Sequence, residues 1–335
     1  MVNLLKVEEA LELKNNVLID TRTPKEYNES HIPGAINAPI LSNDERHIIG
    51  LLYRKNGSEA AIEKGKEIFI PRIGEYLKFF KQHKDKNLIV YCSRGGMRSK
   101  VITEILEKGN YKAIQLENGY KAYRNYILNK LNNYHVKPRL IVIHGLTGTR
   151  KTKIIQKINM PKIDLEGIAQ HRSSLFGGIG LIPRNQKMFE NLLFHEFKKL
   201  ENTKYIIIEG ESRKVGNSII PEKIYQAMKG GLHVKIECSM NMRINHIVEE
   251  YLNTPEKIEQ VKQVIPKLKQ SLTKKIVDEL MQQMENRQYN QVTETILIRY
   301  YDPKYSFSLD EIKYDLVIKN DDINQTIIEL IKFIS

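Results

Sequence analysis

The sequence has few of the features that mark secreted or membrane proteins. Its 335 residues contain only two cysteines, Cys92 and Cys238, which is too few for a disulfide framework and favours a reducing cytosol. No stretch reaches the roughly 18 consecutive apolar residues of a membrane span, and the first residues lack a basic segment followed by a long apolar run. The chain also shows no internal repeat and no low-complexity tract. We therefore expect a cytoplasmic protein with no membrane partner.

Length and charge add two further bounds. A chain of 335 residues is too long for one ordinary domain, so we expect two, and its 41% hydrophobic content is enough for real cores. Lysine and arginine outnumber aspartate and glutamate by 53 to 40, giving a net charge of +13, which favours a polyanion such as nucleic acid as partner. The alternative is a lysine-rich composition spread over solvated surfaces, and charge alone does not decide between them.

Apolar segments alternate with helical patterns along most of the chain. Strand-like runs fall at 17–22, 88–91, 113–116, 139–144, 205–209 and 234–238, and helical patterns between them include 44–55, 58–65 and 71–83. This alternation predicts an α/β protein with parallel sheets. A polar, Asn-rich stretch at 129–138 predicts a linker between a domain at 1–128 and a domain at 139–335, whose later part carries additional helices.

The first candidate site follows the strand at 88–91. That strand leads into Cys92 and then into Ser93, Arg94, Gly95, Gly96, Met97 and Arg98, before the apolar spacing of a helix begins. Such a strand, tight loop and helix N-terminus direct backbone N–H groups at one point, where an anion binds well. We expect Cys92 to be a nucleophilic thiolate there, because amide dipoles and Arg94 or Arg98 would stabilise its charged form. The alternative is a buried cysteine at a strand end.

The second candidate site follows the strand at 139–144. The residues after it read Gly-Leu-Thr-Gly-Thr-Arg-Lys-Thr at 145–152, and a helical pattern follows, which is the context of a phosphate-binding loop. The candidate diphosphate-binding residues are Gly145, Thr147, Gly148, Lys151 and Thr152. Arg150 stands where such loops usually have glycine. Diphosphate binding without ATP hydrolysis is therefore at least as well supported as an ATPase, and a plain strand-to-helix turn is the remaining alternative.

Further acids and bases in the second domain are candidates for the same site. Asp164, Glu166, His171 and Arg172 lie on an expected loop, and Glu209, Glu211, Ser212 and Arg213 follow the strand at 205–209. An apolar strand that ends in a carboxylate after a phosphate loop is typical of a Walker B element, in which the acid positions magnesium or water. Arg213 could clamp a phosphate. No metal site is certain from the sequence, and the candidate is a Mg²⁺ ion near Thr152 and Glu209; an ordinary polar strand end is the alternative.

Several segments of the first domain together resemble a rhodanese domain, which passes sulfur as a cysteine persulfide. They are 18–22, 26–27, 31–35 and the Cys92 loop. The usual sulfurtransferase loop is one residue shorter. Five residues separate Cys92 from Arg98, which is the spacing of tyrosine-phosphatase-like loops, and the wider loop predicts room for a larger tetrahedral anion.

A rhodanese-like domain fused to a phosphate-loop domain closely resembles the tRNA 2-selenouridine synthase family. Matching segments lie at 43–47, 91–99, 116–124, 164–167, 171–172, 186–191, 209–213 and 301–305, the last of which has a turn-like composition. Arg150 and Ser173 depart from the family pattern, and both lie in the second domain.

The resemblance implies a tRNA-modifying transferase. Such an enzyme converts wobble 2-thiouridine to 2-selenouridine through S-geranyl-2-thiouridine, with geranyl diphosphate and selenophosphate as substrates and no tightly bound cofactor. Its partners are tRNA carrying 2-thiouridine and a supplier of selenophosphate; the oligomeric state is unknown. Cys92 matches the family's essential cysteine, needed for the selenium step, and the phosphate loop would suit the geranyl donor. A phosphatase using Cys92 and Arg98, and a rhodanese-type sulfurtransferase coupled to a phosphate-binding module, remain alternatives.

Overall fold

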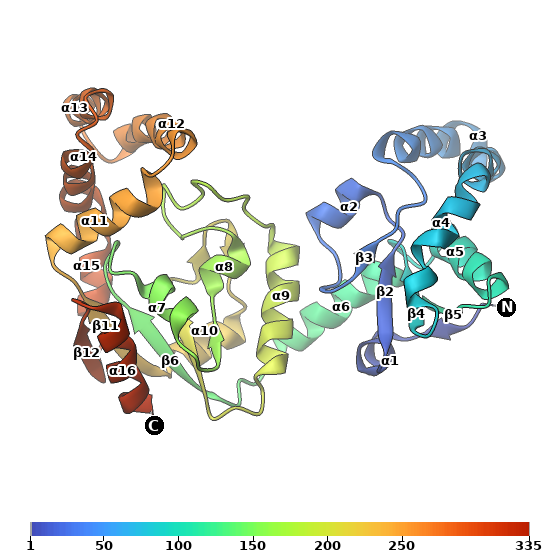
Figure 1. Cartoon of the computed structure of the whole chain (residues 1–335), viewed down its shortest axis with the longest axis horizontal. Coiled ribbons are helices and arrows are strands. Elements are labelled where there is room, and N and C mark those ends of the chain that lie inside the picture. Colours follow the sequence, from blue (N-terminus) through green and yellow to red (C-terminus); the bar gives the residue numbers. More distant parts are fainter. Residues whose placement is uncertain (1, 335) are drawn as a thin grey trace. The chain divides into compact units, whose positions relative to one another are not determined.

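The computed structural model describes residues 2–334, which form two compact units. Unit 1 extends to Leu131 and also includes Glu190–Leu192, and unit 2 comprises the rest from Asn132 onwards. Each unit contains one five-stranded sheet in which all paired strands are parallel, with helices packed around it (Figure 1). The predicted two-domain α/β architecture is therefore confirmed.

Unit 1 places the Cys92 loop at the centre of its sheet. Its strands are β1 (Leu4–Leu5), β2 (Asn16–Asp20), β3 (Ile36–Asn37), β4 (Asn87–Tyr91) and β5 (Lys112–Leu116), in the order β1-β5-β4-β2-β3. Leu88 through Tyr91 of β4 are all fully buried, because helices cover both faces of the sheet. The carboxyl end of β4, where ligands bind in parallel sheets, carries Cys92.

The helices of unit 1 differ in detail from the expected ones. They are α1 (Val7–Glu12), α2 (Pro24–Glu29), α3 (Asn43–Phe69), α4 (Ile73–Phe79), α5 (Met97–Lys108) and α6 (Gly119–Asn132), with short 3₁₀ turns at Ile70–Arg72 and Lys81–His83. The helices expected at 44–55 and 58–65 form α3, which Gly57 interrupts with a non-helical φ of +86°. Helix α6 continues to Asn132, so the first four residues of the expected linker are helical.

Unit 2 is built on the sheet order β12-β11-β6-β8-β7. Its strands are β6 (Arg139–His144), β7 (Lys162–Ile163), β8 (Tyr205–Glu209), β11 (Leu232–Glu237) and β12 (Leu316–Lys319), and a separate hairpin pairs β9 (Lys214–Val215) with β10 (Ser218–Ile219). The helices packed with this sheet are α7 (Lys151–Lys157), α8 (Leu165–Ala169), α9 (Gln186–Lys199), α10 (Glu222–Lys229) and α16 (Ile323–Ile334). The phosphate loop follows the central strand β6.

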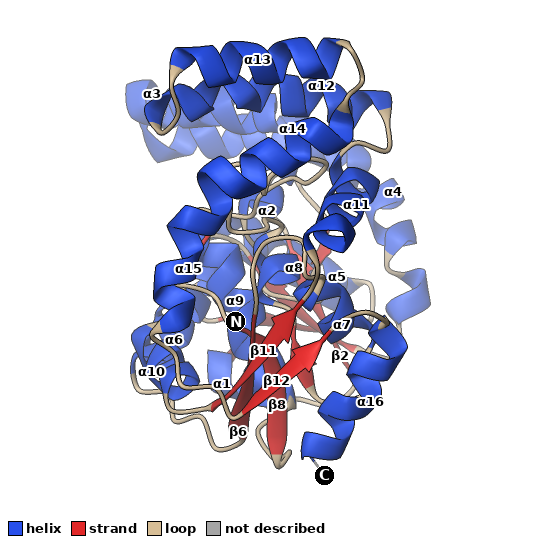
Figure 2. Cartoon of the chain, turned by 90° about the vertical axis from the view of Figure 1, so that its left-hand side faces the viewer, coloured by secondary structure: helices blue, strands red, loops and turns tan. Residues whose placement is uncertain are grey.

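Additional helices between β11 and β12 form a second core, above the carboxyl ends of the strands in Figure 2. They are α11 (Met240–Tyr251), α12 (Pro255–Val264), a 3₁₀ turn at Ile265–Gln270, α13 (Lys274–Glu285), α14 (Tyr289–Ile296), a π-helical turn at Leu297–Tyr301 and α15 (Asp302–Asp310). The turn expected around residue 301 is wrong, because Tyr301 is buried in this core and stacks on Tyr305 within a helix. No helix in the described part of the chain has the length and hydrophobicity to span a bilayer.

Candidate functional site

The sulfur of Cys92 lies inside its loop rather than at the surface. The residue is only 3% exposed. The backbone N–H of Gly96 points at Sγ from 3.3 Å, and the hydroxyl of Ser99, in the first turn of α5, donates to Sγ over 3.2 Å. The loop therefore brings a backbone amide and a hydroxyl to one atom, an arrangement of donors that can stabilise negative charge.

The N-terminus of α6 holds the Cys92 loop from outside. The N–H groups of Tyr120 and Lys121 donate to the carbonyls of Cys92 and Ser93 over 2.8 and 3.0 Å. This approach requires Gly119, which has a φ of +54° and whose added Cβ would lie 2.2 Å from the Cys92 carbonyl oxygen. The side chain of Gln115 adds a bond of 2.7 Å to the carbonyl of Gly95. The shape of the loop is thus fixed by β5 and α6.

Glu26 in α2 forms an ion pair with Arg98. The guanidinium donates to both carboxylate oxygens over 2.7 and 3.2 Å, and Ser93 donates to Oε1 over 2.8 Å. Burial opposes ionisation of Glu26, but the hydrogen bonds and charge of Arg98 outweigh it and lower its pKa to about 2. Arg98 therefore acts on Glu26 and Ser93, while Arg94 is exposed to solvent. Sequence reasoning missed Glu26 as a site residue, although it lies in a segment that carries the rhodanese resemblance.

Two glycines shape the phosphate loop of unit 2. An added Cβ at Gly145 would lie 2.5 Å from the Ile236 carbonyl oxygen, and one at Gly148, where φ is +86°, would lie 2.9 Å from the Arg243 carbonyl oxygen. Lys151 begins α7 and donates from Nζ to the carbonyl of Gly145 over 2.7 Å. The lysine therefore lies over the loop, where its charge would meet a bound phosphate.

Arg150 occupies the position before that lysine with a left-handed backbone, at φ +63° and ψ +27°. Glycine adopts this conformation without strain, which explains why glycine is usual there. The guanidinium of Arg150 forms an ion pair with Glu249 of α11. The departure from the common motif thus changes the side chain without changing the backbone that the loop needs.

Three residues that sequence reasoning missed hold the phosphate loop in place. Arg243 is 4% exposed, donates from Nε to the carbonyl of Thr147 over 2.8 Å, and pairs with both carboxylate oxygens of Asp302 at 2.9 and 2.5 Å. Asn320 donates to the carbonyl of Thr149 over 2.9 Å. Only Asp302 had a signal in the sequence, because it falls within the segment at 301–305.

Buried carboxylates gather beside the phosphate loop. Thr152 donates to Glu166 over 2.7 Å, and Glu209, at the end of the strand beside β6, accepts from the N–H of Leu165 over 2.7 Å through one oxygen. Its other oxygen is buried without a hydrogen-bond partner. Burial and the charge of Glu211 raise the pKa of Glu166 to about 7, and burial also raises the pKa values of Glu209 and Glu211. These acids favour a neighbouring cation or a proton.

The other acid and bases of the expected loop at 164–177 are largely structural. Asp164 caps the short helix α8 by accepting from Gly167 N–H over 2.6 Å, so this segment is partly helical. His171 is partly buried, and burial followed by the charge of Arg172 lowers its pKa. Arg172 pairs with Glu250 at 2.7 Å. These contacts account for Asp164 and Arg172, whereas Nδ1 of His171 is buried without a hydrogen-bond partner.

Ser212 and Arg213 lie at the surface beside the β9–β10 hairpin. The Ser212 hydroxyl donates to the carbonyl of Lys214 over 3.0 Å, and Arg213 pairs with Glu222 at 3.0 Å. Within residues 2–334, neither side chain bonds to the phosphate loop. The structure thus brings Lys151, Thr152, Glu166, Glu209 and Glu211 together but leaves Ser212 and Arg213 apart.

The oxygen-rich surroundings of Thr152 suit Mg²⁺ better than a softer metal. Among the described residues, no group of three or more His, Cys, Asp or Glu is arranged to hold a metal ion. Mg²⁺ at phosphate sites needs only one or two carboxylates besides phosphate and water oxygens. The unpartnered oxygen of Glu209 and the hydroxyl of Thr152 fit that requirement, so they would hold the ion.

Comparisons with known proteins cover nearly the whole chain. Residues 4–126 match the Rhodanese-like domain family, and residues 138–332 match the tRNA 2-selenouridine synthase AAA domain family. The tRNA 2-selenouridine synthase of Nitrosomonas europaea is 34% identical over 77% of this chain and 70% of its own length, and that of Shewanella pealeana is 30% identical over 92% and 93%. A solved N-terminal domain from Clostridium difficile 630 is 38% identical over 38% of this chain and 99% of its own, with a TM-score of 0.37.

Proposed function

The chain belongs to the tRNA 2-selenouridine synthase family, and from this premise we propose that it converts wobble 2-thiouridine of tRNA to 2-selenouridine through an S-geranyl intermediate. The observation that carries the proposal is the presence in one chain of two strand-to-helix loops of the kind that bind anions, one containing Cys92 and the other Lys151. Geranyl diphosphate and selenophosphate each carry a phosphate group that such a loop can bind. We place the reaction in the cytoplasm, with a separate enzyme supplying selenophosphate.

The first step would use the phosphate loop of unit 2. The sulfur of 2-thiouridine attacks the first carbon of the geranyl chain, the carbon–oxygen bond breaks, diphosphate leaves with the electron pair, and the base loses its N3 proton. Lys151 and the loop amides would hold the diphosphate, and a Mg²⁺ ion would neutralise part of its charge. An apolar cavity of about 50 Å³ next to Thr147, lined by Ile247 and Ile296 among others, favours a donor with an apolar tail. The cavity is smaller than a geranyl group, so the surrounding helices would have to open.

The second step would use the Cys92 loop. Selenium of selenophosphate attacks C2 of the modified base and geranylthiol leaves after taking up a proton, so that alkylation has turned sulfur into a better leaving group. Water then cleaves the selenium–phosphorus bond and releases phosphate. The amide of Gly96, the hydroxyl of Ser99 and the thiol of Cys92 would surround the anion. We propose that this step depends on the Cys92 thiol.

Nucleoside mass spectrometry of thiolated tRNA can separate the two steps. With geranyl diphosphate and selenophosphate present, we expect the parent protein to form 2-selenouridine, Cys92→Ser to stop at S-geranyl-2-thiouridine, and Lys151→Ala to form neither. Given RNA that is already geranylated, Lys151→Ala should complete the selenium step. Lys153→Ala, which removes an exposed lysine of α7, is the matched control. Selenation by Cys92→Ser at the parent's rate, or loss of only the selenium step in Lys151→Ala, would contradict the proposal.

The position of Arg98 speaks against the phosphatase alternative. A phosphatase with this cysteine–arginine spacing needs the arginine on the bound phosphate, whereas Arg98 is held by Glu26 and Ser93. Hydrolysis of a phosphoester that depends on Cys92 would reverse this argument. A sulfurtransferase without RNA chemistry is the other alternative, and failure to bind tRNA at moderate salt would favour it.

A further inference from the structure

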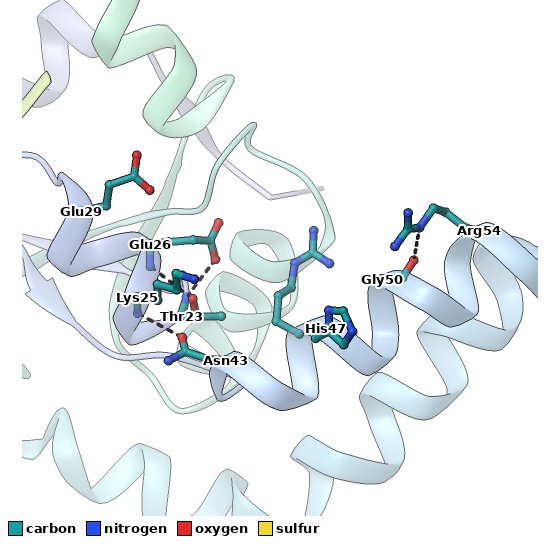
Figure 3. Close-up of a pocket in the computed structure, with 9 residues that line it drawn as sticks. Thr23, Lys25, Glu26, Glu29, Asn43, His47, Gly50 and Arg54 are labelled. Carbon is teal, nitrogen blue, oxygen red and sulfur yellow. Dashed lines mark hydrogen bonds between the residues drawn. The ribbon is translucent and has the colours of Figure 1, made fainter. Parts of the chain in front are cut away.

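A cleft of about 380 Å³ opens in unit 1 between α2 and the first turns of α3 (Figure 3). Most of its lining is polar or charged, and it comprises Thr23, Lys25, Glu26, Glu29, Asn43, Arg46, His47, Gly50 and Arg54. Nothing in the sequence analysis assigned a role to this surface, although residues 43–47 belong to a segment that carries the family resemblance. The cleft is open to solvent, and every lining residue except Gly50 carries a polar or charged side chain.

The cleft carries a stripe of basic residues along α3. Arg46, Gly50 and Arg54 are spaced by four residues and so lie on one face of the helix. Gly50 makes room for the first of them, since a Cβ there would lie 3.0 Å from Arg46 Nη1. Lys25 of α2 adds a third cation on the opposite wall. The stripe therefore faces into the cleft.

The cations of the cleft have no acidic partner. Within residues 2–334, Lys25, Arg46 and Arg54 form no ion pair. Glu45, which precedes Arg46, is held instead by Arg72 at 2.6 Å, and Glu26 is held by Arg98 at 2.7 Å. Glu26 and Glu45 thus have other partners. Glu29 also lines the cleft, so three cations and two acids line it, and the basic side chains are in excess for an anionic ligand.

Glu26 connects this cleft to the Cys92 loop. Its side chain lines the cleft, and its two oxygens accept from Ser93 and Arg98 of the loop. A ligand in the cleft would therefore lie one side chain away from the residues that surround Cys92. Cys92 itself does not line the cleft, so this position suits a part of the substrate that does not itself react.

A nucleic-acid strand is the anion that the proposed function brings to this cleft. Arg46 and Arg54 are eight residues apart, which corresponds to roughly 12 Å along the helix axis. Their long side chains can reach one phosphate or two successive phosphates of such a strand. Arginine and lysine contacts to backbone phosphates position a nucleic acid without reading its sequence.

We propose that the cleft between α2 and α3 binds the RNA backbone beside the nucleotide that reacts at the Cys92 loop, with Lys25, Arg46 and Arg54 contacting its phosphates. This assignment rests on the proposed function, because it takes tRNA as the substrate. It adds the surface of unit 1 that receives the RNA, and it makes helix α3 a substrate-positioning element.

The salt dependence of RNA binding tests this assignment on the full-length protein. Fluorescence anisotropy with a labelled anticodon stem–loop containing 2-thiouridine gives the binding constant across a potassium chloride series. The double variant Arg46→Gln/Arg54→Gln should bind more weakly at low salt. The slope of log K against log salt should become shallower by about 1.4, because each lost single-strand phosphate contact removes about 0.7.

The matched control is Lys84→Gln/Lys108→Gln, which removes two exposed charges of unit 1 at the opposite end of β4 and α5. Its slope should equal that of the parent. An unchanged slope in the cleft variant, or an equal reduction in the control, would overturn the proposal. The proposal would also be overturned if inorganic phosphate competed with RNA for the parent but not for the cleft variant, while the variant kept the parent's RNA affinity. Cys92→Ser should retain the parent slope, so a failure of the proposed chemistry is distinguishable from a failure of this RNA site.

Discussion

The carboxylates beside the Cys92 loop and those beside the Lys151 loop have pKa values that are shifted in opposite directions. In unit 1 a single acid, Glu26, accepts hydrogen bonds from Arg98 and Ser93, and its pKa is lowered to about 2. In unit 2 several acids gather with fewer donors, and burial raises the pKa of Glu166 to about 7. Both loops follow the central strand of a parallel sheet, so the difference arises from the residues that surround them.

This difference implies different requirements for ligand binding. The Cys92 loop is complete without a further ion, because its nearby acid is already neutralised by an arginine. The phosphate loop becomes electrostatically balanced only when a cation or protons join its carboxylates, since like charges buried together are costly. We therefore expect anion binding to unit 2 to depend more strongly on pH and on Mg²⁺ than anion binding to unit 1.

The largest expected effect comes from adding a methyl group at Gly119. Gly119→Ala places a Cβ against the Cys92 carbonyl at a residue with positive φ. We therefore expect the unfolding free energy to fall by about 4 kcal/mol and the selenium step to be lost. Gly34→Ala is the control, because φ there is +82° but nothing lies within 4 Å of the added Cβ. Urea unfolding measures both. Equal losses in the two variants would mean that the contact with Cys92 is unimportant.

Next in size is the loss of Arg243 from unit 2. Arg243→Ala leaves Asp302 without its partner and frees the Thr147 carbonyl, which should cost about 3 kcal/mol and weaken diphosphate binding. Arg213→Ala removes an exposed pair with Glu222 and should change little. Denaturant unfolding and isothermal titration with diphosphate provide the measurements. A neutral Arg243→Ala would show that the phosphate loop keeps its shape without this ion pair.

Acidification should cause a smaller loss of stability, and this loss should be located in unit 1. The pKa of Glu26 is lower in the folded state than its unfolded value of 4.5, so its contribution is full above that value and is lost as pH falls through about 2. We expect on the order of 1–2 kcal/mol, because solvent screens a partly exposed pair. Hydrogen exchange corrected for its intrinsic pH dependence should show this loss in β4 and α5, and Glu26→Gln should abolish it.

Glu166 should act in the opposite direction in unit 2. Its folded pKa of about 7 lies above the unfolded value of 4.5, so its contribution to stability is full below 4.5 and is lost as pH rises through about 7. The same exchange experiment should therefore show α8 losing protection between these values. Protection that rises with pH in both units would remove the contrast between the two loops.

The smallest expected effect concerns Arg150. Arg150→Gly relieves a left-handed backbone worth about 1 kcal/mol and loses an exposed ion pair worth roughly 0.5 kcal/mol, so unfolding free energy should change by less than about 1 kcal/mol. Arg150→Ala keeps the strain and loses the pair, so it should be the less stable variant. Thermal unfolding distinguishes them. Equal stability of the two variants would mean that the backbone at residue 150 is not strained.

Local patterns predicted the two loops well but not the residues that support them. Apolar runs followed by glycine located the loops after β4 and β6, because a buried strand and a tight turn are both encoded locally. The partner of Arg98 lies 72 residues earlier, and Arg243 meets Asp302 across 59 residues, so these pairs depend on sheet order and helix packing. The helix around residue 301 was missed because its aromatic and proline composition resembles a turn, whereas burial of Tyr301 stabilises the helix.

The ion pair of Arg150 has an evolutionary consequence. It joins a position in the phosphate loop to Glu249, which lies 99 residues further along the chain. Glu249 also lies 3.6 Å from Lys153, so a glycine at residue 150 would leave this acid with one basic neighbour instead of two. We therefore expect an acid at position 249 to accompany a basic residue at position 150 more often than a glycine.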